Sequence, residues 1–289
     1  MISTLLIPVH KGRKKHLKSL LKSLAAAEMS DCYPRKLLIV SQDLPDIEEI
    51  ARLELKNLPI PFQTAFFPNA KPLSALRNRG IDLIKTDWVH CLDSDTLLPE
   101  DYFVTLQKNL RRQEFEIDCF QLNFKPMAAR SVWADFEARL DWAILSMYIG
   151  NDRLYGLNGM NFLARTKTIL NIGGFDESLM AAEDIELGNR LYKAGISMAF
   201  LPNVSIRHNY PNRLWKLFRR KFWHGRGYAK VFLKCPDLFS QKKMPDRVKR
   251  FWLKSFFNPG FVWYWLTSWL VFKAGVIYER LKFSGTNLP

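Results

Sequence analysis

Short apolar runs alternate with amphipathic segments along the first hundred residues of the chain. Strands that alternate with helices are typical of a mostly parallel sheet with right-handed crossovers. The first hundred residues are therefore predicted to form an α/β unit of the nucleotide-binding type. Runs rich in leucine and β-branched residues predict strands at 4–9, 36–41, 62–67 and 88–92, and apolar residues at helical spacing predict helices at 17–27, 46–55 and 74–84.

The alternation continues, less regularly, to about residue 210, where the chain becomes basic and aromatic. This change divides the chain into a domain at 1–210 and a separate segment at 211–289. Within the domain, the pattern predicts strands at 118–124, 198–201 and 204–208, a glycine-punctuated approach to another strand at 155–165, and helices at 131–149, 166–172 and 182–194.

Two acidic residues directly follow the apolar strand at 88–92, in the sequence Asp93-Ser94-Asp95. Carboxylates at the carboxyl end of a strand can point into the crevice where open α/β sheets bind ligands. Oxygen ligands of this kind suit Mg²⁺ or Mn²⁺, which usually keeps waters and substrate phosphates in its remaining positions. Such a triplet also arises by chance in a chain with sixteen aspartates, so its position behind a buried strand is what favours a metal-diphosphate site.

The composition is that of a globular protein, with 48 % hydrophobic and 25 % charged residues. The net charge of +15 is unevenly spread. Between Arg207 and Lys254 there are 15 lysines and arginines against two acids, Asp237 and Asp246, which places +13 in this stretch. Such an asymmetry indicates an anionic partner, which could be a membrane surface, a phosphate-bearing lipid or a nucleic acid.

The cysteines and the N-terminus indicate the compartment. Cys32, Cys91, Cys119 and Cys235 show neither a CxxC spacing nor a disulfide-scaffold pattern, so we interpret them as free core thiols in a reducing compartment. The N-terminal residues lack a basic region and a signal-length apolar run, and no export signal is expected. These features predict a cytoplasmic protein.

Five short segments together carry a family pattern. They are Leu6-Ile-Pro-Val-His10, Ala75-Leu-Arg-Asn-Arg-Gly-Ile81, Asp93-Ser-Asp95, Gly173-Gly-Phe-Asp-Glu177, and Glu183-Asp184 followed by Leu187 and Arg190-Leu191. In this order and spacing they resemble the family 2 glycosyltransferases of GT-A fold, over about residues 3–210. The resemblance implies a mixed, mostly parallel α/β sheet flanked by helices, with a nucleotide-binding half at 1–100 and an acceptor half at 101–210.

The resemblance also assigns roles to residues. The divalent ion, Mn²⁺ or Mg²⁺, would be held by Asp93, Asp95 and His208. Asp184 would be the general base, with Glu183 orienting its helix or the acceptor, and a helix N-terminus would favour the ionised carboxylate. The donor would be bound by Pro8, Val9, His10, Gln42, Asp43, Arg77, Asp93, Ser94, Asn158 and Gly159.

Some of these assignments have alternatives. The family's acidic D-D-G-S loop is replaced here by Ser41-Gln42-Asp43-Leu44-Pro45, so either the Gln42 amide or the Asp43 carboxylate could meet a uracil edge. His208 could be a surface histidine beside the basic segment. Glu183 and Asp184 could be no more than the acidic first turn of a helix.

The resulting hypothesis is a metal-dependent inverting transferase. It would move a sugar from a nucleoside-diphosphate donor, a UDP-sugar in our interpretation, to a hydroxyl of a lipid-linked or polysaccharide acceptor. A GT-A-like nucleotidyltransferase would need a glycine- and lysine-rich loop after the first strand, which the basic turn at 10–15 imitates only distantly. A non-enzymatic protein that binds membranes or nucleic acid through its basic segment would leave Asp93, Asp95 and Asp184 unexplained, and we expect no nucleic-acid partner.

The C-terminal segment is expected to be helical. A basic helix with an aromatic face at 212–234 indicates either a membrane interface or packing on the catalytic domain. His224-Gly-Arg-Gly227 within it resembles a tight, phosphate-binding bend. No charge occurs from Ser255 to Phe272, but Asn258-Pro-Gly260 is expected to leave only about twelve apolar helical residues. We therefore predict an interfacial anchor on the inner face of the membrane, or a homodimer contact, in place of a spanning helix.

Overall fold

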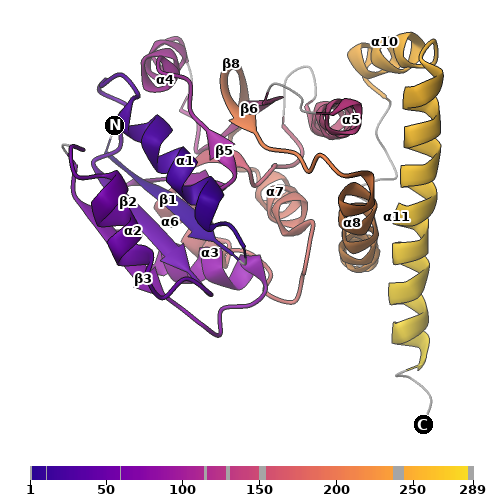
Figure 1. The fold of residues 1–289 in the computed structure, drawn as a ribbon, viewed down its shortest axis with the longest axis horizontal. Helices are drawn as coiled ribbons and strands as arrows, with labels where there is room; N and C mark the ends of the chain where they lie inside the picture. Colours follow the sequence, from indigo (N-terminus) through magenta and orange to yellow (C-terminus); the bar gives the residue numbers. More distant parts are fainter. Residues whose placement is uncertain are drawn as a thin grey trace.

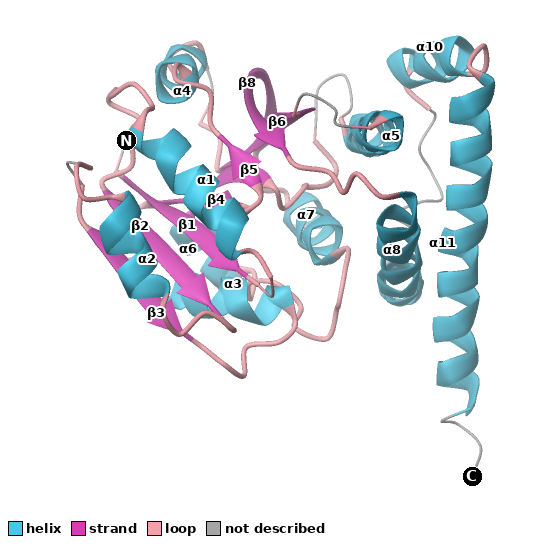
Figure 2. Cartoon of the chain, viewed as in Figure 1, coloured by secondary structure: helices cyan, strands magenta, loops and turns pink. Residues whose placement is uncertain are grey.

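The computed structural model describes residues 2–10, 12–58, 60–113, 116–127, 131–149, 154–236 and 244–285. The strands of these residues form one sheet of eight, in the order β3-β2-β1-β4-β7-β6-β8-β5. Helices cover both faces of the sheet, and three C-terminal helices stand beside it (Figures 1 and 2). Of the predicted C-terminal segment, residues 237–243 and 286–289 lie outside the described part of the chain.

The first half of the sheet is parallel, as predicted. β1 (Ser3–Val9) lies between β2 (Lys36–Ser41) and β4 (Trp88–Leu92), and β3 (Phe62–Phe66) lies outside β2. All seven residues of β1 are buried, because successive side chains enter opposite apolar layers. Leu5 and Ile7 pack with α1 (Lys14–Ala25) and α2 (Ile47–Glu54), whereas Leu6 packs with α3 (Leu73–Asp82).

The second half of the sheet is mixed. β7 (Asn161–Arg165) runs antiparallel between β4 and β6 (Cys119–Pro126). The strands predicted at 198–201 and 204–208 form one strand, β8 (Met198–His208), which is parallel to β6. Leu122 of β6 pairs with Leu201, but the next residue, Asn123, pairs with Ser205. β8 therefore bulges between Leu201 and Ser205. The bulge interrupts the strand pattern, and this is why the sequence predicts two strands here and not one.

A short strand that the sequence pattern did not reveal closes the sheet edge. β5 (Thr96–Leu97) pairs antiparallel with the end of β8, and Thr96 lies opposite His208. With only two residues, this strand is too short to show the alternation of apolar and polar side chains that predicts a strand. The pairing places the last residue of β8 beside the residue that follows Asp95, which is how two distant parts of the sequence meet at one site.

The remaining helices of the first 210 residues are α4 (Tyr102–Leu110), α5 (Val132–Tyr148), α6 (Thr166–Asn171) and α7 (Glu183–Lys193). Three of them agree with the predicted helices within two residues. The helix α4 was not predicted, although Tyr102, Phe103 and Leu106 form its buried stripe. It has nine residues and directly follows the turn around Pro99, so its apolar stripe covers barely two turns.

The described residues of the C-terminal segment form α8 (Leu214–Lys234), α10 (Asp246–Ser255) and α11 (Pro259–Gly285). The predicted bend at His224–Gly227 is wrong, because these residues continue α8 without a break. One glycine of this stretch, Gly225, lies at a helix crossing: a Cβ on it would lie 2.1 Å from the carbonyl oxygen of Phe272 in α11. Opposite it in α11, a Cβ on Gly275 would lie 2.2 Å from the carbonyl oxygen of Phe222 in α8. The backbones of α8 and α11 therefore touch.

The helix α11 has 27 residues and begins at Pro259. The prediction that Asn258-Pro-Gly260 leaves only about twelve apolar helical residues is therefore wrong. Proline is well tolerated in the first turn of a helix, where its missing N–H has no partner to lose. Here Asn258 accepts a hydrogen bond from the backbone N–H of Phe261 at 3.0 Å and starts the helix in place of breaking it. Its residues Pro259–Lys282 are long and apolar enough to cross a membrane, judged by length and composition, and 28 % of the most apolar window is buried.

Several of the basic residues of α8 are used inside the protein. Lys221 lies 2.9 Å from Glu137 of α5, which is fully buried and also accepts a hydrogen bond from Tyr264 of α11 at 2.8 Å. Arg220 pairs with Asp141 at 2.9 Å. A buried carboxylate without such partners would be strongly destabilising, so these contacts bind α5, α8 and α11 to one another. The alternative that the basic helix packs on the catalytic domain is thus correct for this face of α8.

We predict that Gly275→Val destabilises the protein by about 1–3 kcal/mol, because the added carbons must push α8 and α11 apart. The control is Ala274→Val, which introduces the same side chain into the same helix at an exposed position. Thermal unfolding followed by circular dichroism measures both variants. Equal losses of stability in the two variants would show that the helices do not touch at this glycine.

Candidate functional site

The loop Asp93-Ser94-Asp95 leaves β4 at its carboxyl end, as predicted, and is held from both sides. The backbone N–H of Asp93 donates to the carbonyl of Met160 at 3.0 Å, and the carbonyl of Asp95 accepts from the N–H of Asn209 at 3.0 Å. Thr96 Oγ1 donates to the carbonyl of Asp93 at 2.7 Å and closes the turn. The loop is thus tied to the segments that adjoin β7 and β8.

Asp95 lies between a histidine and an arginine. Its side chain is buried, with Oδ2 3.4 Å from Nε2 of His208 and in a salt bridge with Arg13. Burial alone would raise the pKa of the Asp95 carboxyl, but His208, Arg13 and His10 outweigh it and hold the pKa well below its usual range. Asp95 is therefore ionised. His208 is 5 % exposed, so the alternative that it is a surface residue is wrong.

Arg77 joins the two acidic motifs. The guanidinium is 2 % exposed and lies 2.8 Å from Asp93 Oδ1 through one nitrogen and 2.5 Å from Glu183 Oε1 through another. It also lies 5.3 Å from the centroid of the Phe175 ring. A Cβ on Gly159 would come within 2.9 Å of the same guanidinium, so only glycine fits there without displacing it. Arg77 is thus an internal cation that holds its neighbours in place.

Asp184 begins α7 and faces the glycine loop. Its Oδ2 accepts a hydrogen bond from the N–H of Gly159 at 2.6 Å, and its Oδ1 accepts from the N–H of Ile185 at 2.8 Å. Burial, and then the charge of Glu183, raise the pKa of Asp184 to about 7, against the opposing effect of Arg77 and both N–H groups. The net shift is opposite to the one expected from the helix N-terminus alone, because burial is the larger effect.

The residue that precedes this pair has an unusual backbone. Ala182 has a φ of 63°, a conformation that residues other than glycine, asparagine and aspartate seldom adopt. Such a conformation costs on the order of 1–3 kcal/mol and is retained when surrounding contacts require it. Directly after this turn, Glu183 pairs with Arg77 and Asp184 accepts a hydrogen bond from the N–H of Gly159.

The predicted donor-binding residues Asn158 and Gly159 are only partly directed toward the site. Gly159 contacts Asp184 and Arg77, and the N–H of the preceding Asn158 donates to Oε1 of Gln121 at 2.6 Å. The Asn158 side chain folds back and accepts from the N–H of Met160. Gln121 was not predicted, since a single polar residue in a strand gives no signal of what it supports.

The ends of β1 and β2 adjoin as predicted, with Pro8 opposite Val40 and Val9 opposite Ser41. The next residue on β1, His10, has a pKa lowered by burial and by Arg13, and its neighbours also include Asp93 and Asp95. Beyond β2, Gln42 Oε1 and Asp43 Oδ1 are buried and accept no hydrogen bond from any described residue. Unpartnered buried acceptors are costly and indicate positions where a ligand can donate.

One predicted donor-binding residue has little surface to offer. Ser94 is 2 % exposed. Of the aspartates that flank it, Asp95 contacts His208 and Arg13, whereas Asp93 contacts Arg77. The two carboxylates of the triplet therefore have different partners.

Two family-pattern residues that had no predicted role hold the glycine turn at 173–177. Asn78 accepts from the N–H of Phe175 at 2.8 Å and donates to its carbonyl at 2.9 Å. Arg190 donates to the carbonyls of Ile172 and Gly174 at 2.5 and 2.6 Å while pairing with Glu186. Both residues lie in the family-pattern segments that contain Arg77 and Asp184. The structure shows that they bind the turn at 173–177.

Asp95 and His208 fit a divalent ion. A carboxylate and an imidazole that already face each other across 3.4 Å are ligands that Mn²⁺ accepts, with waters and phosphate oxygens completing its shell. Asp93, the third predicted ligand, is directed to Arg77 instead. Within the described ranges, no cluster of three or more His, Cys, Asp or Glu side chains is arranged around one point, so the predicted trio is not preassembled.

A cavity of about 330 Å³ opens beside Asp95. Its lining includes Lys15 and His16 of α1, Ala134 of α5 and Tyr210, which follows β8. Asp184 is not part of this lining. The two acidic motifs do not line this cavity together; they are joined through Arg77, which contacts Asp93 and Glu183.

Solved structures share this fold. A mannosyltransferase, PcManGT from Pyrobaculum calidifontis in complex with GDP-Man and Mn²⁺, aligns with a TM-score of 0.62 at 13 % identity, over 93 % of this chain and 73 % of that one. The S. aureus TarS fragment 1–349 in complex with UDP-GlcNAc aligns with a TM-score of 0.57 at 13 % identity, over 98 % and 92 % of the two chains. Both likenesses establish a GT-A architecture.

Curated relatives match over shorter ranges. The pre-mycofactocin glycosyltransferase of Mycobacterium tuberculosis is 24 % identical over 174 residues, which cover 59 % of this chain and 37 % of that protein. The succinoglycan biosynthesis protein ExoA of Rhizobium meliloti is 39 % identical over 77 residues, or 27 % of this chain and 23 % of that protein. The chain thus spans well under half the length of the curated relatives it matches.

Two family models match the sequence itself. "Glycosyl transferase family group 2" matches residues 88–279, which include the acidic loop, the Glu183-Asp184 pair and most of α11. "Glycosyl transferase family 2" matches residues 4–165, more than half of the 289 residues. The chain belongs to glycosyl transferase family 2.

Proposed function

We propose that the protein transfers a sugar from a nucleoside-diphosphate donor to an acceptor hydroxyl, with inversion at the anomeric carbon. The observation that carries this proposal is the chain of contacts from Asp93 through Arg77 and Gly159 to Asp184. Through these contacts one buried cation links the loop available to the diphosphate, by way of Asp93, with the carboxylate available as a base, by way of Gly159. A transferase needs these two functions next to each other, because bond making and bond breaking occur at one carbon.

The donor base would be read at the ends of β1 and β2. An amide such as that of Gln42 has one acceptor and one donor group, which matches the adjacent N–H and C=O of a uracil edge. The buried, unpartnered Oε1 of Gln42 and Oδ1 of Asp43 support this assignment. We therefore propose a UDP-sugar. A GDP-sugar, the donor class in the PcManGT complex, is the alternative that a donor screen separates.

The metal, Mn²⁺ or Mg²⁺, would be held by Asp95 and His208. When bound, such an ion acts as a Lewis acid for the diphosphate leaving group. Arg13 neutralises Asp95 at the same point. His10, whose pKa is lowered, stays neutral there and adds no further positive charge.

The acceptor would be activated by Asp184. Its carboxylate takes the proton of the attacking hydroxyl while the oxygen bonds to the anomeric carbon and the nucleoside diphosphate departs. A single displacement of this kind needs no covalent nucleophile and inverts the configuration. Glu183 acts as a positioning residue, since it pairs with Arg77 and raises the pKa of its neighbour.

We propose a glycan or a polyprenyl-linked sugar as the acceptor. The name of the relative from Rhizobium meliloti, a succinoglycan biosynthesis protein, supports a growing polysaccharide as the acceptor class. We also propose that the reaction takes place on the cytoplasmic side of the membrane, because the donor class is soluble and the four cysteines are free.

Donor binding is tested by thermal unfolding with a panel of nucleotide sugars, with and without Mn²⁺. We expect a UDP-sugar to raise the melting temperature in the presence of metal, in proportion to its occupancy. Asp95→Asn should remove the metal-dependent part of this rise. Asp82→Asn, an exposed substitution on α3, should leave it unchanged. If no nucleotide sugar stabilises the wild-type protein with Mn²⁺, the proposed function is wrong.

The role of Asp184 is tested by the pH dependence of turnover. Because only the ionised carboxylate accepts a proton, and its pKa is about 7, we expect kcat/KM to rise with pH and level off above about 7. Asp184→Asn should lower kcat by about 10²–10⁴-fold and keep the donor-induced thermal shift. A variant with normal turnover, or a rate that does not change between pH 5 and 8, would assign the base to another residue.

A further inference from the structure

Large apolar side chains are exposed where α10 turns into α11. Phe257 is 89 % exposed, Leu253 is 65 % exposed and Phe256 is 55 % exposed. We call these three residues the aromatic corner. Isolated exposed apolar residues are common on proteins, but a cluster of this size and exposure marks an interaction surface.

The corner continues along the outer side of α11. Trp263, Leu266, Leu270, Ile277 and Leu281 are each at least 46 % exposed. Their spacings of three, four, seven and four residues place them on one face of the helix. The opposite face, which includes Tyr264 and Val276, is buried. We call the exposed set the outer stripe. Figure 1 shows this helix at the edge of the molecule, with α8 and α5 on its inner side.

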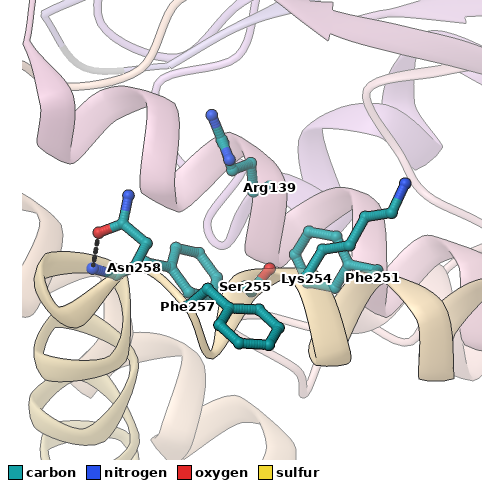
Figure 3. A pocket seen from close by; sticks show the side chains of 7 residues that line it. Arg139, Phe251, Lys254, Ser255, Phe257 and Asn258 are labelled. Atoms are coloured by element: carbon teal, nitrogen blue, oxygen red, sulfur yellow. Dashed lines mark hydrogen bonds between the residues drawn. The ribbon is translucent and has the colours of Figure 1, made fainter.

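A cavity of about 350 Å³ lies directly beside the aromatic corner. Its lining includes Arg139 of α5, Lys254 of α10 and the aromatic rings of Phe251, Phe257 and Phe261. Figure 3 shows the first four of these side chains at the junction of α5 and α10. Lys254 has no ion-pair partner among the described residues, and Arg139 has only an exposed pair with Asp135. Two cations among aromatic rings, open to solvent, suit a ligand with an anionic head and an apolar body.

We propose that the aromatic corner and the outer stripe lie on the surface of an anionic lipid membrane, and that Arg139 and Lys254 bind a lipid phosphate in this cavity. Aromatic side chains favour the headgroup level of a bilayer, and neighbouring cations are attracted to anionic lipids. The inference concerns a surface outside the catalytic site and does not rest on the proposed function.

The contacts of α11 show that it lies along the membrane and does not cross it. Its inner face touches the backbone of α8 at two glycines, and Glu279 pairs with Arg226 of α8 at 2.6 Å. Insertion of α11 across a bilayer would carry α8, with its many lysines and arginines, into the hydrocarbon, or would break these contacts. With α11 in the plane of the interface, only the outer stripe enters the lipid.

A second copy of the chain is a poorer occupant of this face. In a twofold dimer the same patch meets itself, so Arg139 and Lys254 would lie near their own copies. Like charges at an interface oppose association. An anionic bilayer provides both the apolar layer and the opposite charge.

The test is co-sedimentation of the full chain with vesicles of equal parts phosphatidylcholine and phosphatidylglycerol. We expect binding to these vesicles, and little to pure phosphatidylcholine. Phe257→Ser should weaken binding roughly tenfold, because a buried aromatic ring is lost. Lys254→Glu should weaken it by about tenfold or more, because an attraction becomes a repulsion.

Matched controls are Leu53→Ser on α2 and Lys22→Glu on α1, both highly exposed and both expected to bind as the wild type does. All variants should keep the wild-type melting temperature, and also any donor-induced shift that the wild type shows. A donor-induced shift without vesicle binding would refute only the membrane inference, and vesicle binding without a donor-induced shift would refute only the proposed function.

The remaining outcomes decide between occupants. Equal binding to neutral and anionic vesicles, or equal losses in the controls, would overturn the proposal. So would a wild-type dimer that Phe257→Ser converts to a monomer while neither binds vesicles. Stabilisation by inorganic phosphate that depends on Lys254, without vesicle binding, would show a free-anion site instead. Bound protein should be released by alkaline carbonate, and retention would show that α11 spans the bilayer.

Discussion

A buried guanidinium between two carboxylates governs the geometry of this protein. Arg77 is removed from water, so the free energy of the fold depends on keeping both Asp93 and Glu183 against it. The planar fork of arginine offers separate nitrogens to separate partners, which an ammonium on a flexible stem cannot match. Three family-pattern segments, distant in sequence, are therefore bound to one another before any substrate arrives.

The contacts around this cation also explain the state of the neighbouring acid. Asp184 is not paired directly with Arg77 but bonds the N–H of Gly159, whose carbonyl receives the guanidinium at 3.4 Å. Glu183 takes the direct ion pair, and burial then dominates the pKa of Asp184. Glu183 thus holds α7 against Arg77. Asp184 is left with a pKa of about 7, which suits proton transfer near neutral pH.

Sequence periodicity predicted most of the sheet because its strands are long, apolar and separated by helices of ordinary length. It did not reveal β5 or α4, which are too short to show a period, and it divided β8 at the bulge. The motif residues Asp95, His208, Arg77 and Asp184 were predicted to belong to the site, and so were their partners Asp93, Glu183 and Gly159, but the residues Arg13 and Gln121 were not. Arg13 and Gln121 occur in stretches without a distinguishing pattern, and only tertiary contact reveals them. Gly225 and Gly227, which predict a bend, lie instead within a helix and admit close neighbours, the backbone of Phe272 at the first and that of Ala181 at the second. Whether glycine bends a chain or admits a neighbour depends on what packs against it.

The bulge in β8 limits how the number of residues in this strand can vary. The residues inserted between Leu201 and Ser205 set the phase of the strand that follows, and so decide which residue faces Thr96. Loss or gain of one residue there would move Arg207 or Asn209 into the place of His208, because neighbouring strand residues point to opposite faces. Substitutions within the bulge should therefore be tolerated, whereas a change in its length should remove His208 from its place beside Asp95.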